Sequence, residues 1–325
     1  MKTGGAKKKW VSYLKLVFWI LLIQFVLLNV STFLHAGKLT KFYDPAALKD
    51  KTPPKNIFSK TWRLFSGPRY AKPVITSKPI YNYETVILKT TDGLNIEAWY
   101  IQTDSVVKGT VVLFHGLLNC KSDLINEANE FRYMGYNVML VDFRAHGNSD
   151  GYTTTIGYRE SEEVKLAYDW LQKKGEQHVI LFGTSMGAVA IIKAMAENEM
   201  NISGVVLEMP FGSLHQHMKA RAKTLGFPKQ PFGAFVTLWT GVRRGFNGFK
   251  LNTYQNAEKV NCPVLFQWGN NDHLVPKAEA ENIYQHIGSK QKKFVVYEGG
   301  VHSSLLQQNI TQWRIEVEGF LKSLK

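Results

Sequence analysis

Between residue 84 and the C-terminus, short apolar runs alternate with stretches whose apolar residues recur at the helical period. The runs are rich in β-branched residues, which is typical of strands buried on both faces of a sheet. They are Thr110–Phe114, Asn137–Asp142, Val179–Phe182, Gly204–Leu207, Pro263–Trp268 and Phe294–Tyr297. The helical stretches are Asp123–Met134, Tyr158–Lys173, Met186–Asn198, Lys277–Ile287 and Leu305–Leu324. This alternation predicts an α/β fold with a mostly parallel, doubly wound sheet.

Two further runs precede this series and change the expected start of the sheet. Glu84–Thr90 and Leu94–Ile101 flank the turn Thr91-Asp92-Gly93, in which the glycine permits a tight reversal of the chain. A hairpin at this point gives the sheet an antiparallel start. The sequence therefore predicts one large domain over residues 84–325.

The insertion at residues 209–257 interrupts the alternation. It follows the run Gly204–Leu207, so it lies over the carboxyl ends of the strands, where α/β proteins bind ligands. It contains no acidic residue. Its basic and aromatic residues are Lys219, Arg221, Lys223, Lys229, Arg243, Arg244, Lys250, Phe227, Phe232, Phe235, Trp239, Phe246 and Phe249. One interpretation is a small cap with an apolar, aromatic inner face that lines a ligand pocket and a basic rim in which Arg243 and Arg244 face the mouth. The other is a solvated cationic surface around a small core.

The positive charge of the chain is concentrated before the domain. The full chain has a net charge of +14, of which residues 1–83 carry +13 and residues 84–325 carry +1. A nucleic-acid-binding domain is expected to have its basic residues on the folded body. The charge distribution therefore argues against nucleic acid as a partner.

An uncharged segment lies inside this basic region. Residues 16–34, from Leu16 to Leu34, carry no charge and follow Lys7-Lys8-Lys9. As a helix this segment would be roughly 28 Å long, close to the thickness of a bilayer core. We expect a basic segment at 1–15, a transmembrane anchor at 16–34 and a basic, proline-containing linker or arm at 35–83. A cleaved signal peptide is the alternative, although no A-x-A-like site follows.

The lysines around the anchor bear on its orientation. Those before it favour a cytoplasmic N-terminus, with the large domain outside the cytoplasm, or periplasmic in a bacterium. The lysines that follow it nearly balance the two flanks: Lys38, Lys41, Lys49, Lys51 and Lys55. Because long domains are translocated largely regardless of charge, an extracytoplasmic domain is the expected arrangement.

The segment Gly183-Thr184-Ser185-Met186-Gly187 lies between a predicted strand and an alanine-rich helix. A nucleophilic serine on a tight strand–turn–helix elbow requires this setting, because flanking glycines leave room where any Cβ would collide. The alternative is an ordinary turn with a helix-capping serine. The strand before Ser185 and the helix after it favour the nucleophile.

A nucleophilic serine needs a base, and the base needs an acid to orient it. Asp272 follows the run Pro263–Trp268, and His302 follows Phe294–Tyr297, so both lie past the carboxyl ends of late strands. They could instead be a loop-capping acid and a surface histidine. We predict a catalytic triad of Ser185, Asp272 and His302. The backbone N–H groups of Met186 and Leu117 are the expected oxyanion donors, and His115 organises the loop before Leu117.

These motifs resemble those of the α/β-hydrolase superfamily, and within it the branch of serine aminopeptidase S33 and monoglyceride-lipase-like hydrolases. The resemblance rests on His115-Gly116, the elbow, and the three segments Asp142–Ser149, Asp272–Pro276 and Gly300–Ser303. It implies an α/β-hydrolase fold and hydrolysis of an ester, thioester or amide through an acyl-enzyme. The chain lacks the His-Gly-Gly-Gly pattern of one esterase group, which argues against the bulky-ester activity associated with that group. Epoxide hydrolases and haloalkane dehalogenases have aspartate at the position of Ser185, so the serine argues against those two activities.

The sequence therefore predicts a membrane-anchored serine hydrolase, most like an esterase or lipase, that acts on a small-molecule, lipid or peptide acyl substrate. An S33-like aminopeptidase is one alternative, and a catalytically silent, hydrolase-like binding protein is another. We expect no metal or cofactor, because Cys120 and Cys262 are the only cysteines and no C-x-x-C or H-E-x-x-H motif occurs.

Overall fold

The computed structural model describes residues 4–48 and 56–324. Its main sheet has eight strands in the order β10-β9-β8-β7-β5-β6-β4-β3. They are β3 (Glu84–Lys89), β4 (Asn95–Ile101), β5 (Thr110–Phe114), β6 (Asn137–Val141), β7 (Val179–Thr184), β8 (Gly204–Glu208), β9 (Val264–Gly269) and β10 (Lys292–Tyr297). β3 pairs with β4, and β4 with β6, in antiparallel orientation, whereas all other pairs are parallel. The predicted α/β fold with an antiparallel start is confirmed.

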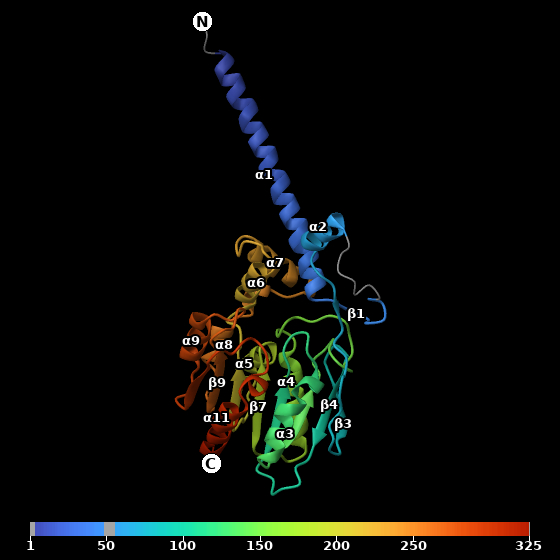
Figure 1. Cartoon of the computed structure of the whole chain (residues 1–325), viewed down its shortest axis with the longest axis vertical. Coiled ribbons are helices and arrows are strands. Elements are labelled where there is room, and N and C mark those ends of the chain that lie inside the picture. Colours follow the sequence, from blue (N-terminus) through green and yellow to red (C-terminus); the bar gives the residue numbers. More distant parts are fainter. Residues whose placement is uncertain (1–3, 49–55, 325) are drawn as a thin grey trace.

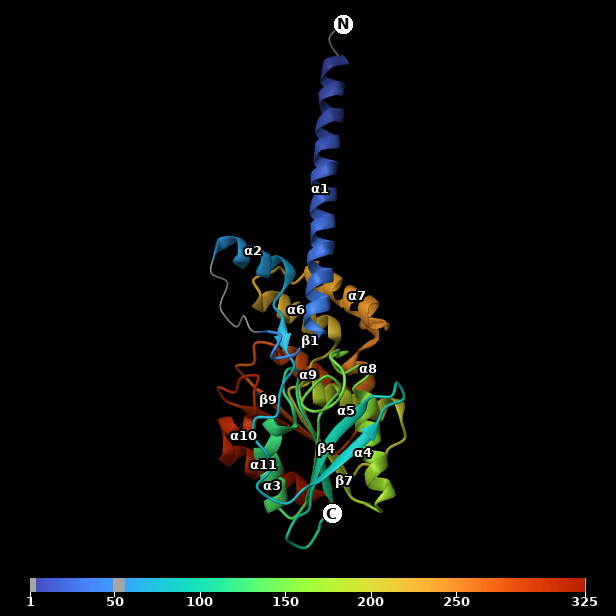
Figure 2. The ribbon, with the colours of Figure 1, turned by 90° about the vertical axis from the view of Figure 1, so that its right-hand side faces the viewer.

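Helices cover both faces of this sheet (Figures 1 and 2). One face is covered by α3 (Ile125–Tyr133), α10 (Leu305–Gln308) and α11 (Ile310–Ser323). A short 3-10 helix, η1 (Lys121–Leu124), comes directly before α3. α4 (Ser161–Lys173), α5 (Met186–Glu197), α8 (Thr253–Ala257) and α9 (Lys277–His286) contact one another in sequence on the other face. Every residue of β5, β6, β8 and β9 is buried, because helices lie on both sides of these strands.

The N-terminal region forms one long helix that projects from this body (Figure 1). α1 runs from Gly4 to Leu39, beyond both ends of the predicted anchor at 16–34. Its stretch Trp10–Leu39 is long and apolar enough to cross a membrane. Most of its large apolar side chains from Trp10 to Val30 are exposed. The side chains of Lys7, Lys8 and Lys9 lie outside the described residues.

The arm after α1 contains structure that the sequence did not lead us to expect. Short strands β1 (Phe42–Tyr43) and β2 (Tyr70–Ala71) pair in parallel, and α2 (Ile57–Ser66) lies between them. α2 begins with a capping box. Asn56 Oδ1 accepts a hydrogen bond from Ser59 N at 2.8 Å, and Ser59 Oγ accepts one from Asn56 N at 3.3 Å. Lys49, Lys51, Pro53, Pro54 and Lys55 of the predicted arm lie outside the described residues.

The insertion at 209–257 forms a helical cap over the carboxyl ends of the strands. The cap consists of α6 (Leu214–Thr224), α7 (Phe232–Arg244) and the 3-10 helix η2 (Gly248–Lys250), and α8 at the end of the insertion packs against α5 and α9. α7 packs along the C-terminal part of α1, where Phe25 meets Phe235 edge-on at 5.8 Å between ring centroids. Phe33 meets Trp239 in the same way at 5.3 Å. The N-terminal helix is therefore joined to the domain through the cap.

Candidate active site

Ser185 stands between the end of β7 and the first residue of α5, on a strained turn. Its φ of 49° and ψ of −111° lie outside the regions that side chains favour. The flanking glycines fit this close packing. A Cβ on Gly187 would lie 2.2 Å from the carbonyl oxygen of Phe114, and one on Gly183 would lie 2.7 Å from the nitrogen of Ala188. The turn therefore holds Ser185 where only glycine fits at the positions two residues before and two residues after it.

His302 connects this serine to a buried acid. Its Nε2 lies 2.8 Å from Ser185 Oγ, and its Nδ1 lies 2.6 Å from Asp272 Oδ2. The other carboxylate oxygen of Asp272 accepts hydrogen bonds from Leu274 N and Val275 N at 2.7 and 2.9 Å. These two backbone donors fix the plane of the carboxylate. The three residues predicted as a triad thus form one hydrogen-bonded chain.

The two residues predicted as oxyanion donors lie on elements that meet at this serine. Met186 is the first residue of α5, so its N–H is one of those that have no partner within the helix. Leu117 follows Gly116 in the loop after β5, and a Cβ on Gly116 would lie 3.5 Å from Cβ of Ser185. The loop of Leu117 therefore passes directly beside the nucleophile.

Buried polar residues hold the loops around the site. His115 Nε2 accepts a hydrogen bond from Phe143 N at 3.1 Å, and burial lowers the pKa of His115 to about 4, so the ring is neutral near pH 7. The carboxylate of Asp142 contacts the ammonium of Lys121, and both side chains are fully buried. Asp142 also accepts from Asn148 N at 2.9 Å. Most of the segment Asp142–Ser149 is buried, and these contacts hold it as a structural loop.

Two groups near the triad were not singled out by the sequence. His217 of α6 is buried against Phe211, and its Nε2 finds no hydrogen-bond partner among the described residues. Burial, with smaller effects of Arg221 and His302, lowers the pKa of His217 well below its usual value. Glu208, at the end of β8, accepts the Ser185 backbone N–H through its carbonyl at 2.8 Å. The position of His217 near the triad could not be predicted, because the insertion has no regular pattern of residues from which to place it.

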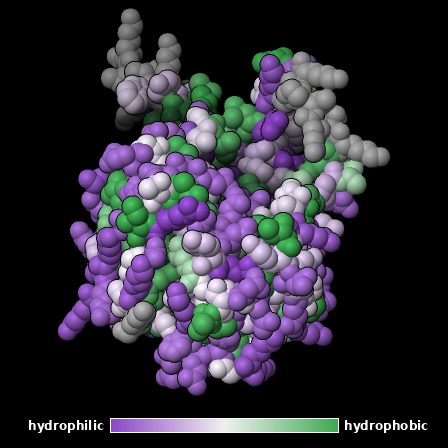
Figure 3. Space-filling model, turned by 60° about the horizontal axis from the view of Figure 1, so that its bottom comes forward, coloured by the Kyte–Doolittle hydropathy of each residue, from purple (hydrophilic) through white to green (hydrophobic). Residues whose placement is uncertain are grey.

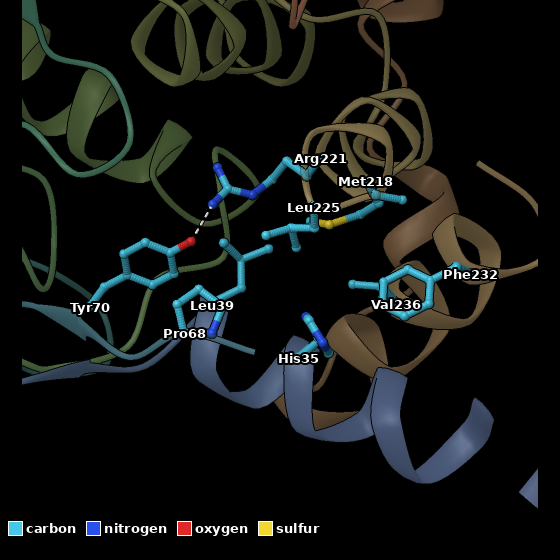
Figure 4. Close-up of a pocket in the computed structure, with 10 residues that line it drawn as sticks. His35, Leu39, Pro68, Tyr70, Met218, Arg221, Leu225, Phe232 and Val236 are labelled. Carbon is cyan, nitrogen blue, oxygen red and sulfur yellow. Dashed lines mark hydrogen bonds between the residues drawn. The ribbon is translucent and has the colours of Figure 1, made fainter. Parts of the chain in front are cut away.

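A pocket lies between the cap, the end of α1 and the arm (Figure 4). It is lined mainly by apolar side chains, and its empty space of about 340 Å³ includes space open to solvent. α1 contributes His35 and Leu39, and the arm contributes Pro68 and Tyr70; the cap contributes Met218, Arg221, Ala222, Leu225, Phe232 and Val236. The guanidinium of Arg221 donates to the hydroxyl of Tyr70 at 2.8 Å.

The expectation that Arg243 and Arg244 face the mouth of the site is wrong. The guanidinium of Arg243 lies over the ring of Phe33, 4.3 Å from its centroid, and Arg244 Nε donates to Thr40 Oγ1 at 2.8 Å. Both cations are therefore used in contacts with α1 and the residue after it. Several cap aromatic residues also face α1 and do not stand free, because the N-terminal helix occupies that side of the cap.

Within residues 4–48 and 56–324, no group of three or more His, Cys, Asp or Glu side chains is arranged to hold a metal ion. Cys120 is buried, and both Cys120 and Cys262 are free thiols.

Comparisons with known proteins agree with this fold. The uncharacterized protein YqkD of Bacillus subtilis is 23% identical over 73% of this chain and 79% of its own length. The lysophosphatidylserine lipase ABHD12 of Xenopus tropicalis is 22% identical over 61% of this chain and 52% of its own length. The structure of the Pyrococcus furiosus esterase Pf2001 superposes with a TM-score of 0.65 at 24% identity, covering 79% of this chain and 99% of the esterase.

The family model named "Serine aminopeptidase, S33" matches residues 105–239 and 246–309, which is more than half of the chain. This match includes the elbow, Asp272 and His302, and it confirms the resemblance inferred from the motifs. The chain is an α/β hydrolase and belongs to the serine aminopeptidase S33 family.

Proposed function

We propose that this protein is a membrane-anchored serine hydrolase that cleaves a carboxylic ester through an acyl-enzyme. The observation that carries this proposal is the unbroken chain from Ser185 Oγ through His302 to Asp272, at 2.8 and 2.6 Å. Such a chain is the minimum that a serine nucleophile needs, since the imidazole must accept the hydroxyl proton in a fixed orientation.

In the proposed first step, Ser185 Oγ attacks the substrate carbonyl carbon as its proton passes to His302 Nε2. The negative charge that develops on the carbonyl oxygen is accepted by the N–H groups of Met186 and Leu117. Asp272 holds the Nδ1–H of His302 and stabilises the imidazolium. His302 then gives its proton to the leaving oxygen, and the C–O bond of the ester breaks.

In the second step, water attacks the acyl-enzyme and gives one proton to His302 Nε2. The tetrahedral intermediate collapses, the acid leaves, and His302 returns the proton to Ser185 Oγ. Asp272 does not itself take up a proton in either step. Its two backbone hydrogen bonds, from Leu274 and Val275, hold the carboxylate in place beside His302.

The ester preference is supported by two proteins to which the chain is similar, an esterase and a lysophosphatidylserine lipase. The family name supports an aminopeptidase as the alternative. A panel of chromogenic esters of rising acyl length, assayed beside aminoacyl amides, separates them. We expect Ser185-dependent hydrolysis of the esters, and hydrolysis of the amides alone would overturn the ester assignment. Failure of a fluorophosphonate to label Ser185 in folded protein would favour a silent binding protein.

The membrane anchor is the second part of the proposal. The exposed apolar side chains of α1 support an uncleaved anchor over residues 16–34, and the lysines before it support a cytoplasmic N-terminus. The hydrolase domain then lies outside the cytoplasm. Protease added to intact cells or spheroplasts should remove a C-terminal tag. A tag that survives while a known external domain is digested would reverse the orientation.

A further inference from the structure

The apolar side of α2 faces away from the protein. An amphipathic helix normally turns this side to the core. Here Ile57 and Phe58 are each 79% exposed, and Trp62 is 55% exposed. Lys60 and Arg63 lie on the other side of the helix, as the spacing along ten residues dictates. These apolar side chains are therefore exposed on a folded, capped helix, and we expect another apolar surface to cover them.

Four hydrogen bonds fix where α2 lies along α1. Ser31 Oγ donates to the carbonyl of Phe65 at 2.6 Å, and His35 Nε2 lies 2.9 Å from the carbonyl of Leu64. Lys38 Nζ donates to Ser66 Oγ at 2.6 Å and to the carbonyl of Gly67 at 3.0 Å. The C-terminal end of α2 is thus fastened to the stretch of α1 between Ser31 and Lys38.

The length of α1 indicates how deep α2 lies relative to the bilayer. From Leu16 to Leu34 the anchor is roughly 28 Å long, which is close to the roughly 30 Å hydrocarbon core of a bilayer. With Leu16 at one boundary, Leu34 lies at the other, and α2 is attached to α1 on either side of Leu34. Tryptophan is enriched at both boundaries of membrane proteins, and lysine and arginine are attracted to anionic headgroups. Trp62, Lys60 and Arg63 of α2 fit that layer.

The cap adds a second apolar face at the same level. α2 and α7 flank α1 at the end of the body from which α1 projects (Figures 1 and 2). On α7, Val242 is 61% exposed and Leu238 is 42% exposed, beyond the side that packs on α1. The far end of the body is mostly hydrophilic, with scattered apolar residues (Figure 3). The exposed apolar side chains of α2 and α7 therefore form a surface on the side of the body from which α1 projects.

We propose that Ile57, Phe58, Trp62, Leu64, Leu238 and Val242 form an interfacial surface that lies in the boundary layer of the bilayer. The proposal rests on the membrane anchor and the hydrolase activity proposed above, and it specifies the substrate class. The substrate is a lipid ester that enters the site from the membrane and is not drawn from the surrounding water.

The pocket of Figure 4 provides the route. It lies between α1, the residues that follow α2 and the two cap helices, so it is next to the interfacial surface. His217 lies one turn of α6 before Arg221, on the same side of the helix as this pocket residue, and its ring is within electrostatic range of His302. An acyl chain in the pocket would follow this face toward Ser185, and Arg221 is the cation available to an anionic headgroup.

The test uses the full chain in liposomes of phosphatidylcholine and phosphatidylglycerol, with a fluorogenic lipid ester in the bilayer and a short-chain ester in the water. The double variant Phe58→Ser, Trp62→Ser should lower kcat/KM for the lipid ester about tenfold or more, because two exposed aromatic anchors are lost. The rate with the short-chain ester should stay within about twofold, because α2 does not contact the triad.

The matched control is Val106→Ser, Tyr133→Ser, which removes two apolar side chains that are 88% and 86% exposed outside the interfacial surface. It should change neither rate. Equal losses on both substrates in the α2 variant would mean that α2 is structural, and an unchanged lipid rate would mean that it is not an interfacial surface. Either result overturns the proposal.

A measurement independent of catalysis separates this proposal from the function itself. Brominated lipids should quench a part of the tryptophan fluorescence that is absent in Trp62→Phe, and quenching identical in both proteins contradicts the depth assigned to α2. If instead Ser185→Ala leaves the short-chain ester rate unchanged, the hydrolase assignment fails while the quenching result still decides the interfacial surface.

Discussion

The Nε of Arg244, at the end of the cap helix α7, donates a 2.8 Å hydrogen bond to Oγ1 of Thr40, 204 residues earlier and directly after α1. Beside it, the guanidinium of Arg243 covers the ring of Phe33. Arg244 is half-buried, and its pKa is lowered by burial and by the charge of Arg243. Nη2 of Arg244 is buried and has no hydrogen-bond partner among the described residues. The bond from Nε to Thr40 and the contact of Arg243 with Phe33 together tie the cap to the anchor.

Thr40→Val removes the acceptor and leaves a half-buried donor without its partner. We expect a loss of about 1–3 kcal/mol in unfolding free energy, as for other unmatched buried polar groups. Arg244→Met removes the donor as well, so the double variant should lose less than the sum of the single variants. Denaturant unfolding of all four proteins in detergent measures this coupling. Strictly additive losses would show that the two groups do not interact.

The triad variants should lose activity while they remain folded. Ser185→Ala and His302→Ala are each expected to lower kcat by about 10⁴- to 10⁶-fold, and Asp272→Asn by about 10⁴-fold, because an amide cannot hold the imidazole in its reactive tautomer. Combined substitutions should add little, since the three residues act as one unit. Hydrolysis of a short-chain ester measures the loss, and unchanged circular dichroism verifies the fold. A variant that keeps a tenth of the wild-type rate would remove that residue from the triad.

Glu208 should make stability depend on pH. Burial raises the pKa of this carboxyl from 4.5 to about 8, while its Oε1 accepts from Trp313 Nε1 at 2.8 Å. Between these two values the folded protein holds a proton that the unfolded chain has lost. The wild type therefore loses stability as pH rises through this window.

Glu208→Gln cannot titrate but keeps the acceptor for Trp313. Its advantage over the wild type in unfolding free energy should grow from pH 5 to pH 8, by at most about 1.4 kcal/mol per pH unit. Chemical unfolding at three pH values measures the trend. A difference that stays constant with pH would mean that Glu208 has the same protonation state in both forms.

Lys121→Met should destabilise the domain strongly. The ammonium of Lys121 and the carboxylate of Asp142 are both fully buried, so removal of one leaves an uncompensated charge. The expected cost is about 3–5 kcal/mol. Lys165→Met is the control, because its partner Asp169 is exposed and the pair is on a helix surface; about 0–1 kcal/mol is expected there. Similar costs for both variants would contradict the buried-charge explanation.

The fold of the domain could be predicted because its strands are sheltered on both faces. Such strands read as continuous apolar runs, and each predicted run from Thr110–Phe114 onward overlaps a strand of the structure. The residues of the proposed site follow from the same rule. Ser185, Asp272 and His302 each lie in the segment that follows a parallel strand, so the chain order alone places them at one edge of the sheet.

The packing of the N-terminal region could not be predicted in the same way. α2 is a ten-residue helix in a proline-containing segment, and its signal is the local pair Asn56 and Ser59. The contacts of Arg243 and Arg244 join residues about 200 positions apart, and no local pattern encodes them. The insertion indicated a cap, but the neighbour that covers it is set by tertiary packing alone.

α1 contributes His35 and Leu39 to the wall of the pocket, so the anchor and the pocket share one element. Proteolytic release between Leu39 and Phe42 would therefore open that wall as well as free the domain from the bilayer. A shed, soluble form would keep the hydrogen-bonded chain from Ser185 to Asp272 but present a wider, solvent-filled entrance. Its substrate range would then differ from that of the tethered protein, so a truncated enzyme would be a poor proxy for the specificity of the full-length chain.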